Sequence, residues 1–216
     1  MKGIIQELKV LLKTKSIGTN SDRALLLDFQ ATLETKPEKA IKLEKDALAQ
    51  IENITADNAR LVSNLHANLG GLYRMNGHPD LAREHMEKSI SLLDQFNLLH
   101  INDSIPQIAN YAMFLTEQQE PERGISELQK LSGIIKEYHS DDCLDYAKVQ
   151  ETLGTIYLMT ANLPQAKTHF KRAFKIYEKI WADEPEMIEA KYQEIQELYP
   201  QIGFCIGKNL SGLLTK

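Results

Sequence analysis

Apolar residues recur at helical spacing along almost the whole chain. Within residues 1–14 they follow the spacing i, i+1, i+4, i+7, i+8, which places them on one face of a helix. The same three-to-four-residue spacing continues through 79–96, 121–138 and 164–181. No segment alternates apolar and polar residues over the length of a strand. The pattern therefore predicts an all-α protein.

The helical segments repeat with a period of 42 residues. The segment Asn68–Tyr73 returns, after one period, as Asn110–Leu115 and, after two, as Thr152–Tyr157, and a weaker copy begins near Leu26. A proline marks the second half of each unit, since its fixed φ suits a first helical turn and its missing N–H costs nothing there. These prolines are Pro37, Pro79, Pro121 and Pro164, the last one residue late. We therefore interpret each unit as helix, short turn, helix.

Small residues recur at one position in each half of the unit. Two helices pack at 8–10 Å only where the contact carries little side chain, so these positions predict the crossing points. They are Gly70, Ala112 and Gly154 in the first halves and Ala82, Gly124 and Ala166 in the second. Larger apolar residues beside them are expected to form the core, namely Leu69, Tyr111, Leu153, Met86, Leu128 and Phe170.

These residues resemble the tetratricopeptide repeat, whose usual unit has 34 residues. The matches are Leu69-Gly70, Tyr73, Gly77, Ala82 and Ser89, and again Leu153-Gly154, Tyr157, Ala166, Phe170 and Ala173. A 42-residue period with a lengthened second helix resembles the kinesin light chain-like branch. The resemblance is good over 60–190 and weak over 20–58, and the middle copy departs from it at Ala112, Leu115, Gln119 and Gly124. It implies a right-handed α-solenoid of helix-turn-helix repeats, a tetratricopeptide-like superhelix.

The repeat register predicts how the chain is divided. We expect an N-terminal amphipathic capping helix over 1–19, four 42-residue repeats over 20–185, and a C-terminal partial repeat or capping helix over 186–216. The repeats would span about 20–60, 61–103, 104–145 and 146–185. Arrays usually end in a polar face, but this end carries Ile202, Phe204, Cys205, Ile206, Leu210, Leu213 and Leu214. This tail is expected either to fold back as a cap or to form a homodimer.

Composition narrows the classes of function. Lys+Arg number 25 and Asp+Glu 30 among 216 residues, a net charge of −5, which argues against a nucleic-acid-binding protein. No apolar run approaches the roughly 18 to 20 residues of a membrane span. Two cysteines, Cys143 and Cys205, exclude a disulfide scaffold, and Gln6, Glu7 and Lys9 interrupt what would otherwise resemble a signal sequence. We expect a cytoplasmic protein.

The sequence contains no motif for catalysis, a metal or a cofactor. The six histidines form no HExxH, and no cysteine lies at ligand spacing from one of them. Gly70-Gly71 falls within a helix, so it is not a phosphate-binding loop. The acidic cluster over 183–197 is best interpreted as a solvated face. We therefore expect a non-enzymatic protein without cofactor or metal.

The resemblance also implies a binding surface, because the first helix of each repeat lines the concave face of such an array. An Asn on this face commonly holds the backbone of an extended peptide, since its carboxamide offers a donor and an acceptor together. The alternative is that Asn68 forms its hydrogen bonds within the array itself. The implied partner-binding residues are Asn64, Asn68, Arg74, Asn110, Thr116, Lys148, Glu151 and Thr152.

These observations favour a protein–protein interaction module, an adaptor or scaffold that binds a protein or peptide segment in its concave groove. One alternative is a peptide-sensing signalling regulator. Such proteins usually carry an additional effector domain, for which the chain before residue 20 is too short. The other alternative is a structural unit that assembles with itself through the apolar C-terminal tail.

Overall fold

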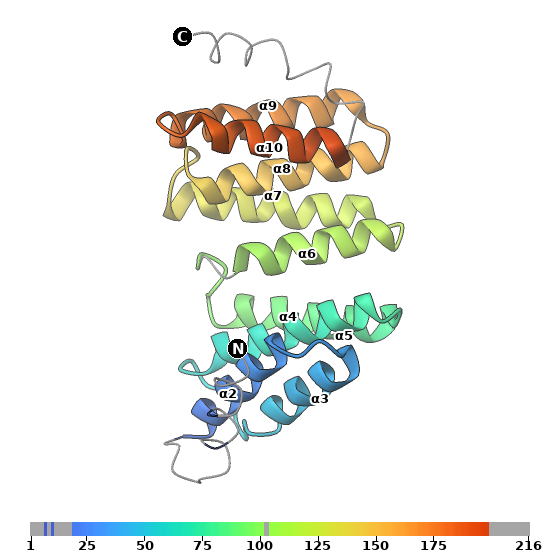
Figure 1. Cartoon of the computed structure of the whole chain (residues 1–216), viewed down its shortest axis with the longest axis vertical. Coiled ribbons are helices and arrows are strands. Elements are labelled where there is room, and N and C mark those ends of the chain that lie inside the picture. Colours follow the sequence, from blue (N-terminus) through green and yellow to red (C-terminus); the bar gives the residue numbers. More distant parts are fainter. Residues whose placement is uncertain (1–6, 8–9, 11–18, 102–103, 199–216) are drawn as a thin grey trace. The chain divides into compact units, whose positions relative to one another are not determined.

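The computed structural model describes residues 7, 10, 19–101 and 104–198, where all regular secondary structure is helical (Figure 1). The chain forms two compact units, unit 1 (residues 1–111) and unit 2 (residues 112–216). Most of the predicted capping helix over 1–19, and the apolar tail beyond residue 198, lie outside the described residues. The helices are α2 (Asn20–Thr32), α3 (Pro37–Leu48), α4 (Ala59–Met75), α5 (Pro79–Gln95), α6 (Ser104–Glu117), α7 (Pro121–Tyr138), α8 (Leu144–Met159), α9 (Leu163–Ile180) and α10 (Pro185–Leu198).

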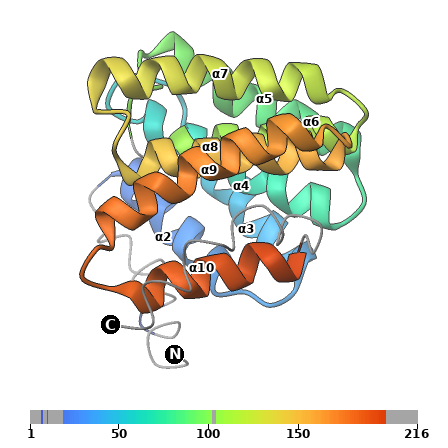
Figure 2. The same cartoon turned by 90° about the horizontal axis from the view of Figure 1, so that it is seen from above.

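The helices form antiparallel pairs joined by short turns. In unit 1, α2 packs against α3 and α4 against α5, with α3 also touching α4. In unit 2, α7 packs against α8, α8 against α9 and α9 against α10. Figure 2 shows α8 and α9 side by side. The long second helices α5, α7 and α9 begin and end within one residue of the bounds predicted from the apolar spacing.

The turns inside the pairs follow the 42-residue period in their backbone geometry. Gly77, Gln119 and Ala161 all have left-handed φ, at 73°, 67° and 58°. In each turn the following N–H donates to the carbonyl five residues earlier, for example from Asn162 to Tyr157 at 2.7 Å. This bond closes a helix C-terminus in the Schellman manner. Gln119 therefore replaces the expected glycine without changing the turn.

At the predicted crossing points, paired helices lie so close that one of them has no room for a Cβ. A Cβ placed on Gly70 would lie 2.6 Å from Met86 Cγ, and one on Gly154 would lie 2.9 Å from Phe170. In the middle copy the small residues are exchanged, because Gly124 of α7 would place a Cβ 2.6 Å from the carbonyl oxygen of Ala112. The unusual Ala112 and Gly124 therefore compensate for each other, and one of the two helices still lacks a side chain at the crossing.

Each unit has its own apolar core. In unit 1, Ala24, Ala47 and Leu65 are fully buried, and Leu27, Leu48, Ile51 and Leu61 pack around them. In unit 2, Leu153, Ile156, Phe170 and Tyr177 are at most 1% exposed. The larger apolar residues expected beside the crossing points are buried in both units.

A polar pair recurs between the helices of α4–α5 and of α8–α9. His66 Nδ1 lies 2.8 Å from His85 Nδ1, and the ring of Tyr73 stacks on His85 with ring centroids 5.4 Å apart. Two periods later, Gln150 Oε1 lies 2.9 Å from His169 Nδ1, and Tyr157 stacks on His169. A histidine pair at this distance holds only one shared proton, whereas the amide oxygen of Gln150 also accepts from a protonated imidazole.

The histidine pair predicts acid sensitivity in unit 1. Burial, then the charges of His85 and Lys88, lower the pKa of His66 to about 4. Stability from neutral His66 is complete above its ordinary pKa of about 6.5 and is lost as the pH falls from there towards 4. His66→Gln recreates the Gln–His pair of unit 2. We compare the free energy of unfolding of the variant with that of wild type at each pH. The variant should gain roughly 1 kcal/mol or more on wild type when the pH is lowered from 7.5 to 5.

Urea unfolding of wild type and variant at both pH values measures this difference. The matched variant Gln150→His should introduce the same acid sensitivity into unit 2. A stability difference between His66→Gln and wild type that does not change with pH would show that the pair does not limit stability in acid.

Candidate functional site

Three successive first helices line one cavity in unit 1. Its volume is about 300 Å³, and its walls come from α2, α4 and α6. This arrangement is the one expected of an inward-facing surface in a helix-pair array. The lining residues are Asp28, Thr32, Asn64, Ala67, Asn68, Pro106, Gln107 and Asn110.

A second cavity of about 220 Å³ adjoins the first. The two share Ala67, Gln107 and Asn110, so together they form one continuous groove, which we call the unit 1 groove. The second cavity is more apolar, because two methionines line it. Its other lining residues are Gly71, Arg74, Met75, Met86 and Ser89.

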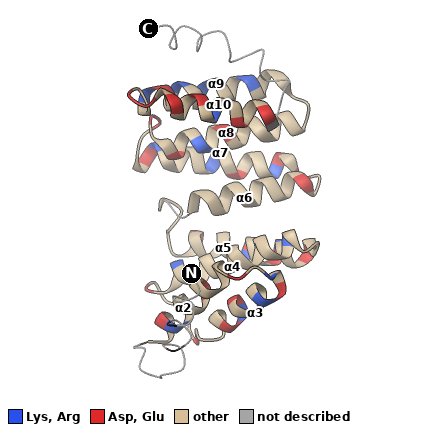
Figure 3. Ribbon diagram, viewed as in Figure 1, with Lys and Arg blue, Asp and Glu red and all other residues tan. Residues whose placement is uncertain are grey.

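Gln107 is held rigidly in the groove wall by both ends of its amide. Its Oε1 accepts from the hydroxyls of Ser63 at 2.8 Å and Ser89 at 2.6 Å, both of which are buried. Its Nε2 donates to Asn64 Oδ1 at 2.5 Å. This network fixes the start of α6 against α4 and α5. Figure 3 shows that α6 carries almost no charged side chains, so amides dominate its contribution to the groove.

A carboxyl pair lies at the α2 end of the groove. Asn68 Nδ2 donates to Asp28 Oδ1 at 2.8 Å and to Glu44 Oε1 at 3.2 Å. Glu44, on α3, is only 1% exposed. Its burial and the nearby charge of Asp28 raise the pKa of Glu44 to about 8, and burial also raises the pKa of Asp28.

The pair therefore carries one negative charge at neutral pH. Glu44 Oε2 has no hydrogen-bond partner in the described part of the chain, so ionisation would leave a buried charge without a donor to this oxygen. The hydrogen bond between the two carboxyl groups also requires that one of them carries a proton, which agrees with a neutral Glu44. The charge then resides on Asp28, which is the member of the pair that lines the groove.

Four of the eight predicted site residues line the unit 1 groove. Asn64 and Asn68 line the first cavity, Arg74 lines the second, and the exposed Asn110 lines both. Asn68 also bonds to Asp28 and Glu44, so its amide nitrogen serves the fold, as the alternative interpretation of this residue expected. Among the asparagines of the groove, only Asn110 is exposed.

The other four predicted residues lie in unit 2 and have contacts there. Thr116 is buried, and its hydroxyl donates to the carbonyl of Ala112 in its own helix. The Thr152 hydroxyl donates to the carbonyl of Lys148, and Lys148 Nζ lies 3.8 Å from Asp145.

Glu151, the last of the predicted residues, joins three helices of unit 2. Its carboxylate accepts from Tyr177 of α9 at 2.6 Å and from Lys191 of α10 at 2.8 Å. These contacts attach α10 to the α8–α9 pair. Glu151 therefore has a structural role in unit 2, and the structure gives it no separate contact surface.

The residues missed by sequence reasoning are Asp28, Glu44 and Gln107. Glu44 lies between Ala40 and Ala47 on the buried face of α3, and a charged residue in such a position is a detectable signal. Asp28 and Gln107 have no such signal, because neither belongs to a polar column that repeats after 42 residues.

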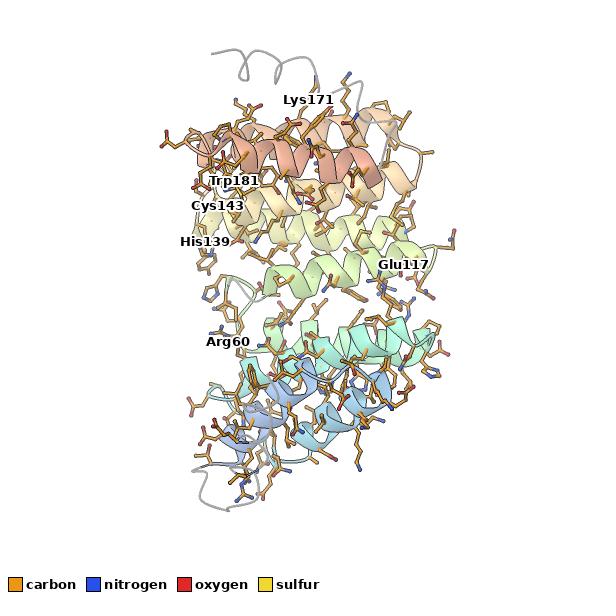
Figure 4. The ribbon with its side chains drawn as sticks, in the orientation of Figure 1. Arg60, Glu117, His139, Cys143, Lys171 and Trp181 are labelled. Carbon is orange, nitrogen blue, oxygen red and sulfur yellow. The ribbon has the colours of Figure 1, made fainter. Side chains whose placement is uncertain are left out.

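The described residues contain no group of three His, Cys, Asp or Glu side chains that could hold a metal ion. Cys143, labelled in Figure 4 near Trp181, caps α8 by accepting from the backbone N–H of Tyr146 at 3.4 Å. This contact gives the thiol a structural role. In the described part of the chain, none of the helices has the length and apolar character that a membrane span needs.

Comparisons with known proteins agree with this architecture. The tetratricopeptide repeat family model matches residues 104–179. Among solved structures, BtubC (BKLC) from P. vanneervenii is similar with a TM-score of 0.74 and 18% sequence identity, over 97% of this chain and 87% of that chain. No curated protein matches the chain significantly in sequence.

Two further structures have the same fold. The TPR-like repeats of a kinesin light chain-type protein from Podosopora anserina give a TM-score of 0.68 at 14% identity, over 84% of this chain and 90% of that chain. MamA gives 0.57 at 15% identity, over 82% and 89%.

The chain therefore has the all-α fold of tetratricopeptide repeat arrays, as seen in the TPR-like repeats of the kinesin light chain type, and its residues 104–179 match the tetratricopeptide repeat family. This confirms the fold and the resemblance predicted from the 42-residue period.

Proposed function

We propose that the chain is a non-enzymatic adaptor or scaffold that binds an extended protein or peptide segment in the unit 1 groove. The main support is that three successive first helices bring amide side chains to one continuous surface. Asn110 supplies both a donor and an acceptor, and Gln107 keeps its second amide N–H, which suits a peptide backbone whatever its side chains.

The groove consists of two adjacent cavities, of about 300 and 220 Å³. Each has a volume suited to one side chain of a bound segment. Their continuity through Ala67, Gln107 and Asn110 suits a ligand that extends from one into the other.

The proposal includes the cytoplasmic setting and the protein partner expected from the sequence. A net charge of −5 disfavours a nucleic-acid ligand. The division into four repeats over 20–185, and homodimer formation through the tail, remain predictions of the same proposal.

The two groove asparagines should differ in their importance for stability. Asn68→Ala removes the donor shared by Asp28 and the buried Glu44, so we expect it to lower the free energy of unfolding by about 1–3 kcal/mol. Asn110→Ala changes an exposed amide and should stay within about 0.5 kcal/mol of wild type. Urea unfolding of both variants tests this, and equal losses would contradict the assignment.

Binding is tested by selecting ligands from a displayed library of random twelve-residue peptides on the immobilised full chain. A selected peptide should bind Asn110→Ala about tenfold more weakly than wild type, since one good amide contact contributes about 1 kcal/mol or slightly more. The matched control is Gln95→Ala, an exposed amide on α5 that lines neither cavity. Equal affinity of the selected peptides for wild type and Asn110→Ala would contradict binding in the groove.

A further inference from the structure

We propose that the unit 1 groove selects a segment with a Lys or Arg side chain for its first cavity and an apolar side chain for its second. This inference rests on the proposed function and assigns a chemistry to the partner. The groove thereby gives a bound segment a direction, with its basic residue towards α2 and its apolar residue towards the end of α4.

The first cavity has a carboxylate without a cationic partner in the described part of the chain. Asp28 is the only charged residue among those that line this cavity. Its hydrogen bonds go to Asn68 and to Glu44, and neither of these groups is a cation. A carboxylate held by two fixed partners and partly shielded from water attracts an ammonium or guanidinium group more strongly than an exposed one does.

The surroundings of Asp28 favour a cation over a neutral donor. Because Asp28 is held in place, its remaining oxygen lone pairs face a ligand without reorganisation of the side chain. Thr32 and Asn110 line the same cavity and provide hydrogen-bond acceptors for the other N–H groups of a bound cation. A carboxylate on the ligand would instead be repelled.

The second cavity has the opposite character. Met75 and Met86 line it, and methionine thioethers adapt to apolar groups of different shape. At Gly71 a Cβ would meet no atom within 4 Å, so the floor of the cavity is open at this position. Arg74 also lines this cavity, and its charge disfavours a second basic residue there.

The test uses the displayed library of random twelve-residue peptides on the full chain. Selected peptides should be enriched in Lys or Arg at one position and in an apolar residue at a fixed distance from it. A synthetic copy of one selected peptide, labelled with fluorescein, then gives affinities by fluorescence anisotropy. Replacing its basic residue by Gln should weaken binding to wild type about tenfold.

The variant Asp28→Asn locates the charge recognised by that residue. It keeps an acceptor for Asn68 and should weaken the basic peptide about tenfold. When Asp28→Asn is combined with the peptide that has Gln for its basic residue, the loss of affinity should be little larger than for either change alone, because each removes the same ion pair. The matched variant Asp94→Asn removes a carboxylate from the exposed end of α5, away from both cavities, and should leave the affinity for the basic peptide unchanged.

The outcomes separate this inference from the proposed function. Peptides that lose affinity with Asn110→Ala but show no basic preference would overturn the charge assignment and leave groove binding intact. Additive losses for Asp28→Asn and the peptide change would place the basic residue elsewhere and also overturn it. A library that yields no binding peptides would overturn both. Where Asp28→Asn folds poorly, the peptide substitution measured on wild type still tests the basic preference.

Discussion

Gly124→Ala is expected to lower the free energy of unfolding by about 1–3 kcal/mol or more, although alanine is the better helix former. The added Cβ would lie 2.6 Å from the carbonyl oxygen of Ala112 and 3.2 Å from its Cα. These are backbone atoms of α6, so no side chain can rotate away. The two helices must separate, which disturbs the packing of Leu128 and its neighbours.

A control in the same helix separates packing from helix propensity. At Gly133 of α7, a Cβ would meet no atom within 4 Å, so Gly133→Ala should stabilise the chain by about 0.5–1 kcal/mol. The double variant Ala112→Gly with Gly124→Ala recreates the arrangement of α4 and α5 and should recover part of the loss. Urea unfolding measures all three. Equal stability of Gly124→Ala and Gly133→Ala would show that the crossing point is wrong.

Raising the pH from 6.5 to 8 is expected to destabilise unit 1 by roughly 1–2 kcal/mol through Glu44. The pKa of Glu44 is about 8 in the folded chain and has its ordinary value, near 4.3, in the unfolded chain. The folded state therefore binds more protons between these values. The stability that protonated Glu44 contributes is fully present below its ordinary pKa and is lost as the pH rises through 8. The pKa values of His66 and His85 are lowered, so both side chains are neutral in the folded chain over this interval, and their small opposite contribution from the unfolded chain cancels in the comparison with a Glu44 variant.

Glu44→Gln removes this pH dependence with little change in shape. The Gln side chain still accepts from Asn68 and donates to Asp28 at every pH. Its free energy of unfolding should therefore vary less between pH 6.5 and 8 than that of wild type, by the same roughly 1–2 kcal/mol. Urea unfolding at both pH values gives the comparison. The same slope in both proteins would show that Glu44 is ionised in the folded chain at neutral pH.

The helix pairs can be predicted from the sequence because the features that form them repeat. The small residues at the crossings follow the 42-residue period, and so do the prolines near the start of α5, α7 and α9, except that Pro164 comes one residue late. The departures in the middle copy are harder to interpret from sequence. Ala112 and Gly124 compensate for each other only in space, and Gln119 keeps the left-handed turn of Gly77 without being a glycine.

The groove can be predicted only in part, because its polar contacts do not repeat. Asn64 and Asn110 follow from their place on the first helices. Gln107 and Asp28 acquire their roles from single contacts, with Ser63 and Ser89 in one case and Asn68 in the other. A repeat period reveals only residues that recur, so such single contacts cannot be predicted from it. For the same reason, it does not distinguish Glu151, which holds α10, from a residue that faces a partner.

The most direct test of peptide binding in the unit 1 groove is hydrogen–deuterium exchange of the full chain with and without a saturating selected peptide. Exchange reports local opening and contact along the backbone. Binding in this groove predicts slower exchange in α2, α4 and the start of α6, with α9 unchanged, and loss of this protection in Asn110→Ala. Protection confined to α7–α10 or to the residues beyond 198 would contradict groove binding and place the partner elsewhere on the chain.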